Sequence, residues 1–357
     1  MDIKNLVRKN ILNLKPYTSA RDLYEGSGIL LDANENSWGT TFTKIEDLLD
    51  EKFNLELNRY PDPHQKEIRE LVGNLIAIPK DNLFFGVGSD EIIDLMIRIF
   101  CNPGKDKVII PEPTYGMYKV ACDVNDIETV EVLLNDNFQA DLSVIRNNYS
   151  SNVKMIFLCS PNNPTGNLLN KEDVILLCNE FNSIIVVDEA YIDFAGDGSI
   201  INEVKNYPNL VVLRTFSKAW GLAGIRLGYC AANAEIINLL FKIKAPYNIN
   251  SLTRFALEAS IKNLELKEKY IRGIVKERKR LKNQLETLPD VITIYNSDAN
   301  FLLVKFKNAR RVQAKLAEAG IIVRDRSSQP KLENCLRISI GSEEENDILW
   351  NELKKIA

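Results

Sequence analysis

Short apolar runs that recur between helical patterns constrain the fold of this chain more than any other feature. The runs occupy 108–110, 155–159, 184–187, 211–216 and 227–232, and helical patterns lie at 89–100 and 171–181. Strands that are apolar on both faces and alternate with helices are typical of a parallel sheet covered by helices. The sequence therefore predicts an α/β fold with a mostly parallel central sheet flanked by helices.

The pattern changes at about residue 250. A charged helical stretch runs to about residue 286, and alternating strand patterns follow at 300–305 and 335–340. These patterns predict a smaller α+β domain. We expect an N-terminal segment over 1–45 that packs on the small domain, a large domain over 46–248, and the small domain over 249–357.

Composition narrows the class of protein. The chain has 357 residues, with 45 Lys and Arg against 49 Asp and Glu, and its net charge of −4 argues against a nucleic acid or an anionic membrane as partner. No stretch approaches the roughly 20 apolar residues of a membrane span, and the N-terminus lacks the apolar core of a secretory signal. The six cysteines are scattered, so we expect no metal site and a cytoplasmic protein.

A lysine and an aspartate at the ends of two apolar runs carry the clearest chemical signal. Lys218 follows Ser217 and precedes Arg226 by eight residues, and Asp188 ends the run at 184–187. A shielded lysine can attack carbonyls as a free amine, and a buried carboxylate is costly unless it meets a cation. Serine and arginine supply donors for a phosphate. This set is what a pyridoxal phosphate (PLP) enzyme needs, although each residue alone is more often a loop charge, a helix cap or a structural ion pair.

Other polar residues lie near the expected strand ends, where ligands of open α/β sheets bind. Asn163, in a loop with two prolines and a glycine, can donate to a ligand oxygen, and Tyr191 can reach the same ligand. Ser89 and Asp90 follow two glycines and precede an apolar helix, which suits a phosphate. Arg337 alternates with apolar residues, so it is either a solvated charge or a clamp for a substrate carboxylate. For the loops, an ordinary turn or helix cap is the alternative.

Taken together, these segments resemble the fold-type I PLP-dependent aminotransferases and, within them, the histidinol-phosphate aminotransferase family. The resemblance covers nearly the whole chain. The motifs that carry it include Leu-Lys-Pro-Tyr at 14–17, Asn-Glu-Asn at 34–36, Arg-Tyr-Pro-Asp at 59–62, Asn-Pro-Thr-Gly at 163–166, Asp-Glu-Ala-Tyr at 188–191 and Ser-Lys at 217–218. It implies an aspartate-aminotransferase-like fold, PLP as cofactor, small-molecule substrates and a homodimer onto which the N-terminal segment also packs.

The resemblance also implies roles around the cofactor. Lys218 would form the Schiff base with PLP and move the substrate proton, while Asp188 would keep the pyridine nitrogen protonated. Asn163 and Tyr191 would hydrogen-bond the ring oxygen, and Tyr191 completes the catalytic set. The residues that would contact the cofactor are Ser89, Asp90, Glu91, Tyr115 (stacked on the ring), Asn163, Asp188, Tyr191, Ser217, Lys218, Arg226 and, from the partner subunit, Tyr60.

The resemblance implies a substrate site beside the cofactor. Arg337 would hold the α-carboxylate of glutamate, while Tyr17 and Arg324, with Asn34 nearby, would hold the phosphate of the second substrate. The implied reaction interconverts histidinol phosphate and 2-oxoglutarate with imidazole-acetol phosphate and glutamate, in histidine biosynthesis. A threonine-phosphate decarboxylase, an aromatic amino-acid aminotransferase and a non-catalytic PLP-binding regulator are the alternatives. One departure concerns specificity: the family commonly has a proline after Asn-Glu-Asn, and this chain has a serine at position 37.

Overall fold

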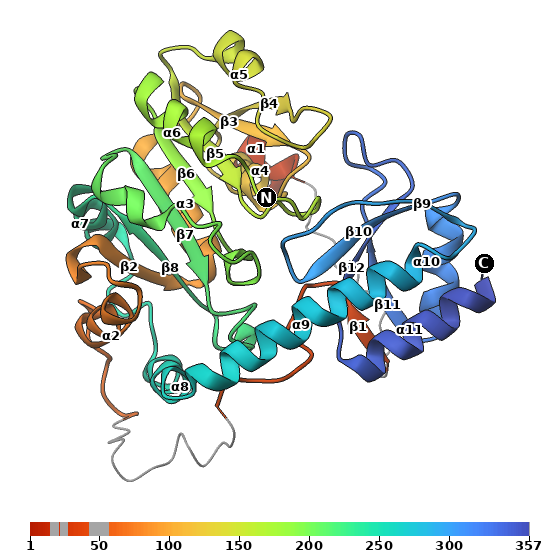
Figure 1. Cartoon of the computed structure of the whole chain (residues 1–357). Coiled ribbons are helices and arrows are strands. Elements are labelled where there is room, and N and C mark those ends of the chain that lie inside the picture. The colour runs from red at the N-terminus through yellow and green to blue at the C-terminus, as the bar shows by residue number, and fades with distance from the viewer. Residues whose placement is uncertain (15–20, 22–27, 43–56, 357) are drawn as a thin grey trace.

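The structure is a computed structural model that describes residues 1–14, 21, 28–42 and 57–356. Figure 1 shows two sheets in separate halves, and the long helix α9 (Leu264–Leu285) runs from one half to the other. The larger sheet has seven strands and the smaller has five. The predicted α/β architecture with a second, smaller unit is confirmed.

The seven-stranded sheet is mostly parallel, as the apolar runs predict. Its order is β2-β8-β7-β6-β5-β3-β4, and only β8 among these strands runs antiparallel to its neighbours. The strands are β2 (Leu83–Val87), β3 (Lys107–Glu112), β4 (Glu128–Leu133), β5 (Val153–Cys159), β6 (Ile184–Asp188), β7 (Leu210–Thr215) and β8 (Leu227–Ala232). The carboxyl ends of β5, β6 and β7 therefore meet at one edge.

Helices cover both faces of this sheet because successive strand residues point to opposite sides. Ile185 and Val187 pack in one apolar cluster, and Val186 between them packs in the other. One face is covered by α3 (Gly88–Phe100), α4 (Met117–Val124) and α7 (Ala234–Ile243). The other is covered by α2 (Lys66–Ile76), α5 (Leu142–Asn148), α6 (Lys171–Glu180) and α8 (Ser251–Ile261), whereas the short α1 (Lys9–Leu12) rests on α4. No helix in the described ranges is long and apolar enough to cross a membrane.

The small sheet combines strands from the two ends of the chain. Its order is β1-β11-β12-β10-β9, and β1 from the N-terminal segment runs parallel to β11. The elements are β1 (Ile29–Leu31), β9 (Val291–Ile294), β10 (Phe301–Phe306), α10 (Ala309–Glu318), β11 (Ile321–Asp325), β12 (Cys335–Ser339) and α11 (Glu343–Ile356). The expected domain boundaries stay a prediction, and the first of them lies outside the described residues.

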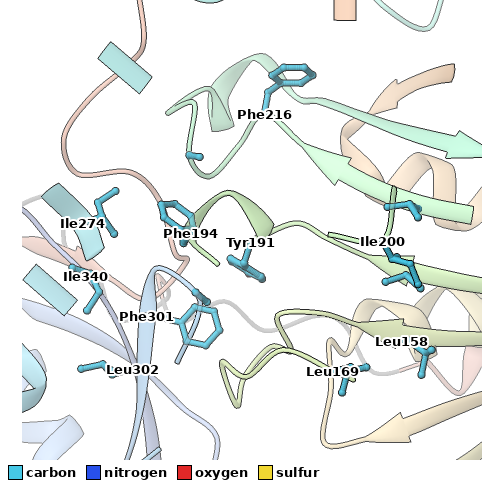
Figure 2. Close-up of a cluster of buried hydrophobic side chains, with 14 of the residues drawn as sticks. Leu158, Leu169, Tyr191, Phe194, Ile200, Phe216, Ile274, Phe301, Leu302 and Ile340 are labelled. Atoms are coloured by element: carbon cyan, nitrogen blue, oxygen red, sulfur yellow. The ribbon is translucent and has the colours of Figure 1, made fainter. Parts of the chain in front are cut away.

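An apolar contact zone joins the two sheets, as Figure 2 shows. Tyr191, just after β6, meets Phe301 at the start of β10 edge to face, with ring centroids 5.1 Å apart. Phe194, Ile274 and Ile340 belong to the same cluster. The two halves are thus packed together beside the carboxyl end of β6.

Candidate active site

A cleft of about 280 Å³ opens where the carboxyl ends of the parallel strands face the small sheet. Most of the residues singled out in the sequence line it. They are Asn34, Ser89, Asp90, Tyr115, Asn163, Asp188, Tyr191, Ser217, Lys218, Arg226, Arg324 and Arg337. Segments far apart in the sequence therefore form one site.

Lys218 projects into this cleft from the turn after β7. Its Nζ donates a 2.8 Å hydrogen bond to the backbone oxygen of Ala33 and lies 5.7 Å from the centre of the Tyr191 ring. Burial removes water from the ammonium, and the nearby charge of Arg337 adds to the effect, so the pKa of Lys218 falls to about 8. The side chain is therefore a base and a nucleophile much nearer neutral pH than an ordinary lysine.

Asp188 ends β6 with a carboxylate that is only 2% exposed. Tyr118 donates to its Oδ2 at 2.8 Å, and the backbone N–H of Ala190 donates to Oδ1 at 3.0 Å. Burial nevertheless raises the pKa of Asp188 to about 6. No described residue forms an ion pair with it, so a protonated ring nitrogen would supply the cation that this carboxylate lacks.

Tyr191 lies between two side-chain amides. Its hydroxyl accepts N–H bonds from Asn34 at 3.0 Å and from Asn163 at 3.4 Å. Burial raises the pKa of Tyr191 to about 12, so the phenol keeps its proton and can donate it in a hydrogen bond to a ligand oxygen. Asn163 also joins the two walls of the cleft, because its amide oxygen accepts a 2.6 Å hydrogen bond from Arg337.

The turn between β2 and α3 forms a cradle that suits a phosphate. Gly88 has a φ of +72°, and a Cβ there would lie 2.8 Å from Nη2 of Arg226. The amide groups at the start of α3 favour an anion. Thr215 and Ser217 also line the cleft, near this turn because Gly86 and Thr215 both pair with Gly228, and the Ser217 N–H donates to the Thr215 hydroxyl at 3.0 Å. With the cation site at Asp188 and the amine of Lys218, this donor set fits PLP.

Tyr115 and Arg226, which lie beside the cradle, both contact Asp90. Tyr115 donates to Asp90 Oδ1 at 3.1 Å, and Arg226 lies 3.6 Å from Asp90 Oδ2. Both side chains line the cleft, so one carboxylate orients an aromatic ring and a guanidinium beside the phosphate cradle.

The small sheet contributes a wall rich in arginine. Arg337 is 4% exposed and donates to the Asn163 amide oxygen and to the backbone oxygen of Asp32, so it is not a solvated strand residue. Arg324 pairs with Arg337 across β11 and β12. Arg326 follows Arg324 by two residues and also lines the cleft. This wall is suited to anionic groups of a substrate.

Three predicted residues are not brought to the cleft by the described part of the chain. Glu91 does not line it, because its carboxylate accepts from the Val87 N–H at 2.5 Å and from Asn248 at 3.0 Å. Tyr60 is 80% exposed and stacks on Tyr247 with ring centroids 4.4 Å apart. Tyr17 lies outside the described residues.

The structure also adds residues that the sequence analysis missed. Thr215 had a usable signal, since it is a polar residue near the end of the apolar run at 211–216 and lies two residues before Ser217. Arg21 lies 3.7 Å from Asp32 in the cleft wall, and its position in the sequence gave no signal. The described residues contain no His, Cys, Asp or Glu cluster suited to a metal ion.

Comparison with known proteins places this geometry in a family. A family model for class I and II aminotransferases matches residues 27–353. A histidinol-phosphate aminotransferase from Cytophaga hutchinsonii is 44% identical over 353 residues, which are 99% of this chain and 98% of the relative. One from Christiangramia forsetii is 45% identical over 358 residues, with 99% of this chain and 98% of the relative covered.

A solved structure agrees with the sequence relatives. The histidinol-phosphate aminotransferase from Clostridium acetobutylicum is 28% identical, with a TM-score of 0.83 over 92% of this chain and 98% of that one. The Sinorhizobium meliloti histidinol-phosphate aminotransferase, solved in complex with pyridoxal-5'-phosphate, is 22% identical, with a TM-score of 0.88 over 98% of this chain and 97% of that one. The second likeness concerns the fold alone.

Proposed function

The chain belongs to the class I and II aminotransferases and, within them, to the histidinol-phosphate aminotransferase family, and from this we propose its reaction. It interconverts L-histidinol phosphate and 2-oxoglutarate with imidazole-acetol phosphate and L-glutamate, a step of histidine biosynthesis, and uses PLP as cofactor. When bound, PLP withdraws electrons from the substrate Cα and carries the amino group between the two substrates.

One observation carries the proposal: the amine of Lys218 and the carboxylate of Asp188 face one cleft, and neither forms an ion pair within the described residues. Lys218 has a lowered pKa because burial disfavours its charge, and Asp188 has a raised pKa for the same reason. Burial of two ionisable groups without ion-pair partners lowers the stability of the fold, so it is not explained by folding. It suits a ligand that combines an aldehyde for the amine with a ring nitrogen for the carboxylate.

The cleft residues that belong to the large-sheet half form what we call the large-sheet wall. They would hold the cofactor and move the proton. Lys218 would take the proton from the substrate Cα and return it, a role that its lowered pKa favours. Asp188 would hold a proton on the ring nitrogen. Asn163 and Tyr191 would hydrogen-bond the ring oxygen, and Tyr115 would lie against the ring.

The cradle would hold the phosphate through Ser89, Thr215, Ser217 and the Arg226 guanidinium, which line one end of the cleft. Asp90 would orient the Arg226 guanidinium beside the phosphate, since the two side chains are already in contact. We assign Glu91 no direct contact, because its carboxylate is engaged on the far side of the turn.

The small-sheet wall would select the substrates. Arg337 would hold the α-carboxylate of glutamate in place of its present partners, the amide of Asn163 and the carbonyl of Asp32. Histidinol phosphate has no carboxylate, so its phosphate needs a second cationic contact, for which we propose Arg324. Asn34 would orient Tyr191 beside the substrate.

We further propose a cytoplasmic homodimer in which Tyr60 of one subunit reaches the phosphate cradle of the other. The dimer contact is supported by Tyr60, which is exposed and lies away from the cleft of its own chain. The cytoplasmic location is supported by the six cysteines, which are all free thiols, as in a reducing compartment. Sedimentation would report the assembly. A Tyr60→Phe variant that binds PLP as tightly as the wild type would contradict the contact.

An absorbance titration tests the reaction. The purified protein with PLP should show the visible band of the bound cofactor, and L-histidinol phosphate and L-glutamate should each bleach it. L-phenylalanine and L-threonine phosphate should act weakly. Bleaching by phenylalanine alone would indicate an aromatic aminotransferase, and release of CO₂ from threonine phosphate would indicate a decarboxylase. A protein that binds no PLP would overturn the whole proposal.

A further inference from the structure

Tyr118 is a buried residue of α4 that no sequence motif singled out. Its side chain is 0% exposed and its ring stacks on Phe157, with centroids 4.7 Å apart and ring planes 6° from parallel. Its hydroxyl donates to Asp188 Oδ2 at 2.8 Å. The packing fixes the phenol, and its hydroxyl lies beside the Asp188 carboxylate, a strong acceptor, and the Cys159 thiol, a weak one.

The surroundings of Asp188 show why this hydrogen bond matters. Burial is the main cause of the raised pKa of Asp188, and the negative charges of Asp90 and Glu189 raise it further. Glu189 itself is occupied by Arg214, which approaches it to 2.8 Å, so that guanidinium does not compensate Asp188. The hydrogen bond from Tyr118 acts in the opposite sense and favours the ionised carboxylate.

We propose that Tyr118 is a positioning residue that keeps the Asp188 carboxylate ionised and aimed at the ring nitrogen of the cofactor. The inference rests on the proposed PLP enzyme and adds a residue to its site. The Ala190 N–H holds one carboxylate oxygen and Tyr118 holds the other, so the two donors fix the plane of the group before the cofactor binds.

The same ring links two parts of the cofactor site. Tyr118 meets Tyr115 edge to face, with centroids 5.4 Å apart and planes at 85°. Tyr115 lines the cleft, whereas Tyr118 lies behind it. Replacement of Tyr118 by phenylalanine keeps both ring contacts and removes one oxygen atom, so the variant isolates the hydrogen bond from the packing.

The test compares Tyr118→Phe with a matched control, Tyr149→Phe. Tyr149 also bonds through its hydroxyl, at 3.2 Å from Ser183 Oγ, and packs on Phe181, but it lies at the amino ends of the strands. The apoprotein of each variant is titrated with PLP and with the carbocyclic analogue in which carbon replaces the ring nitrogen. Melting temperatures check that each variant is folded.

We expect Tyr118→Phe to weaken PLP binding about tenfold or more, because a hydrogen bond to a buried charged group is lost. Binding of the analogue should change less than about twofold on the same argument, since it offers no ring nitrogen to Asp188. Tyr149→Phe should alter neither dissociation constant. In an Asp188→Asn background, Tyr118→Phe should have no further effect on PLP binding, because the two residues act through one contact.

Two results would overturn the inference. Equal weakening of PLP and the analogue would mean that Tyr118 only shapes the cleft, and unchanged binding of both would mean that its hydroxyl has no role. Failure of the wild type to bind PLP is a different outcome, since it would sink the proposed function itself.

Discussion

The two walls of the cleft are built differently. On the large-sheet side, Asp188 is the last residue of β6, and Asn163 and Lys218 come shortly after β5 and β7, so neighbouring strands bring the three together. On the small-sheet side, Arg324 and Arg337 lie on antiparallel strands whose sheet is completed by β1 from the other end of the chain. Under the proposed function, this difference separates two roles: the wall on the parallel sheet would hold the groups needed for every substrate, and the other wall would present the charges that select substrates.

The largest expected effect separates the shared chemistry from substrate choice. Lys218→Ala removes the proposed base of both half-reactions and should lower turnover by about two to four orders of magnitude with histidinol phosphate and glutamate alike. Lys171→Ala, which removes a lysine bound to the backbone oxygen of Asp197 on the surface, should leave both rates unchanged. Steady-state kinetics with each donor reports the result. A variant that slows one donor and spares the other would break the division between the walls.

The next prediction contrasts adjacent carboxylates of the large-sheet wall. Asp188 faces the cleft, whereas Glu189 is paired with Arg214 and accepts from Ser199 behind it. Glu189→Ala removes a buried carboxylate and leaves the Arg214 guanidinium, which is 16% exposed, without this partner, so the free energy of unfolding should fall by about 3–5 kcal/mol. Urea denaturation measures the change.

The control for this change is Glu180→Ala, which breaks the surface ion pair with Arg146. It should cost less than about 1 kcal/mol, because water screens exposed charges. Equal losses in the two variants would mean that the pair behind Asp188 gives no special support to the wall.

The pH dependence of the apoprotein tests the environment of Lys218. Its pKa falls from the ordinary 10.5 to about 8 in the folded state, so the unfolded chain binds more protons between these values. Folding stability should therefore rise with pH through this window, by up to about 3 kcal/mol for this group. Denaturation of wild type and Lys218→Met across pH 8 to 10.5 isolates the contribution. Parallel curves for the two proteins would contradict the lowered pKa.

The smallest effect concerns the small-sheet wall. Arg324→Ala should raise the KM for histidinol phosphate by roughly 30-fold, the equivalent of one charged hydrogen bond of about 2 kcal/mol. The KM for glutamate and the PLP affinity should change little. Arg311→Ala, at an exposed ion pair with Asp290, is the matched control. Equal losses with both substrates would place Arg324 outside substrate selection.

The sequence predicted the large-sheet wall well for a physical reason. An apolar run marks a buried strand, and the polar residue that follows it marks the strand end, so Asp188 and Lys218 could be placed without coordinates. The same local pattern could not show whether Arg337 is a solvated charge or a clamp for a substrate carboxylate. Alternation in its strand allows a solvated side, but the structure buries both sides of β12 against other segments.

The sequence did not predict the residues that support the cleft from behind, for a different reason. Tyr118 lies in an amphipathic helix, where an aromatic residue reads as core, and its hydrogen bond to Asp188 joins residues 70 positions apart. Arg21 and Arg326 reach the cleft only through tertiary packing. Glu91 is the opposite case, since it adjoins Ser89 and Asp90 in the sequence but its carboxylate accepts from Val87 and Asn248 and does not line the cleft.

The most direct test of the account is to locate the attachment of the cofactor. The protein is incubated with PLP, reduced with borohydride to fix the bond to the amine, digested and analysed by mass spectrometry. The account predicts that the phosphopyridoxyl group is found on the peptide that contains Lys218. A label on another lysine, or no label, would contradict the claim that the wall at the strand ends carries the chemistry.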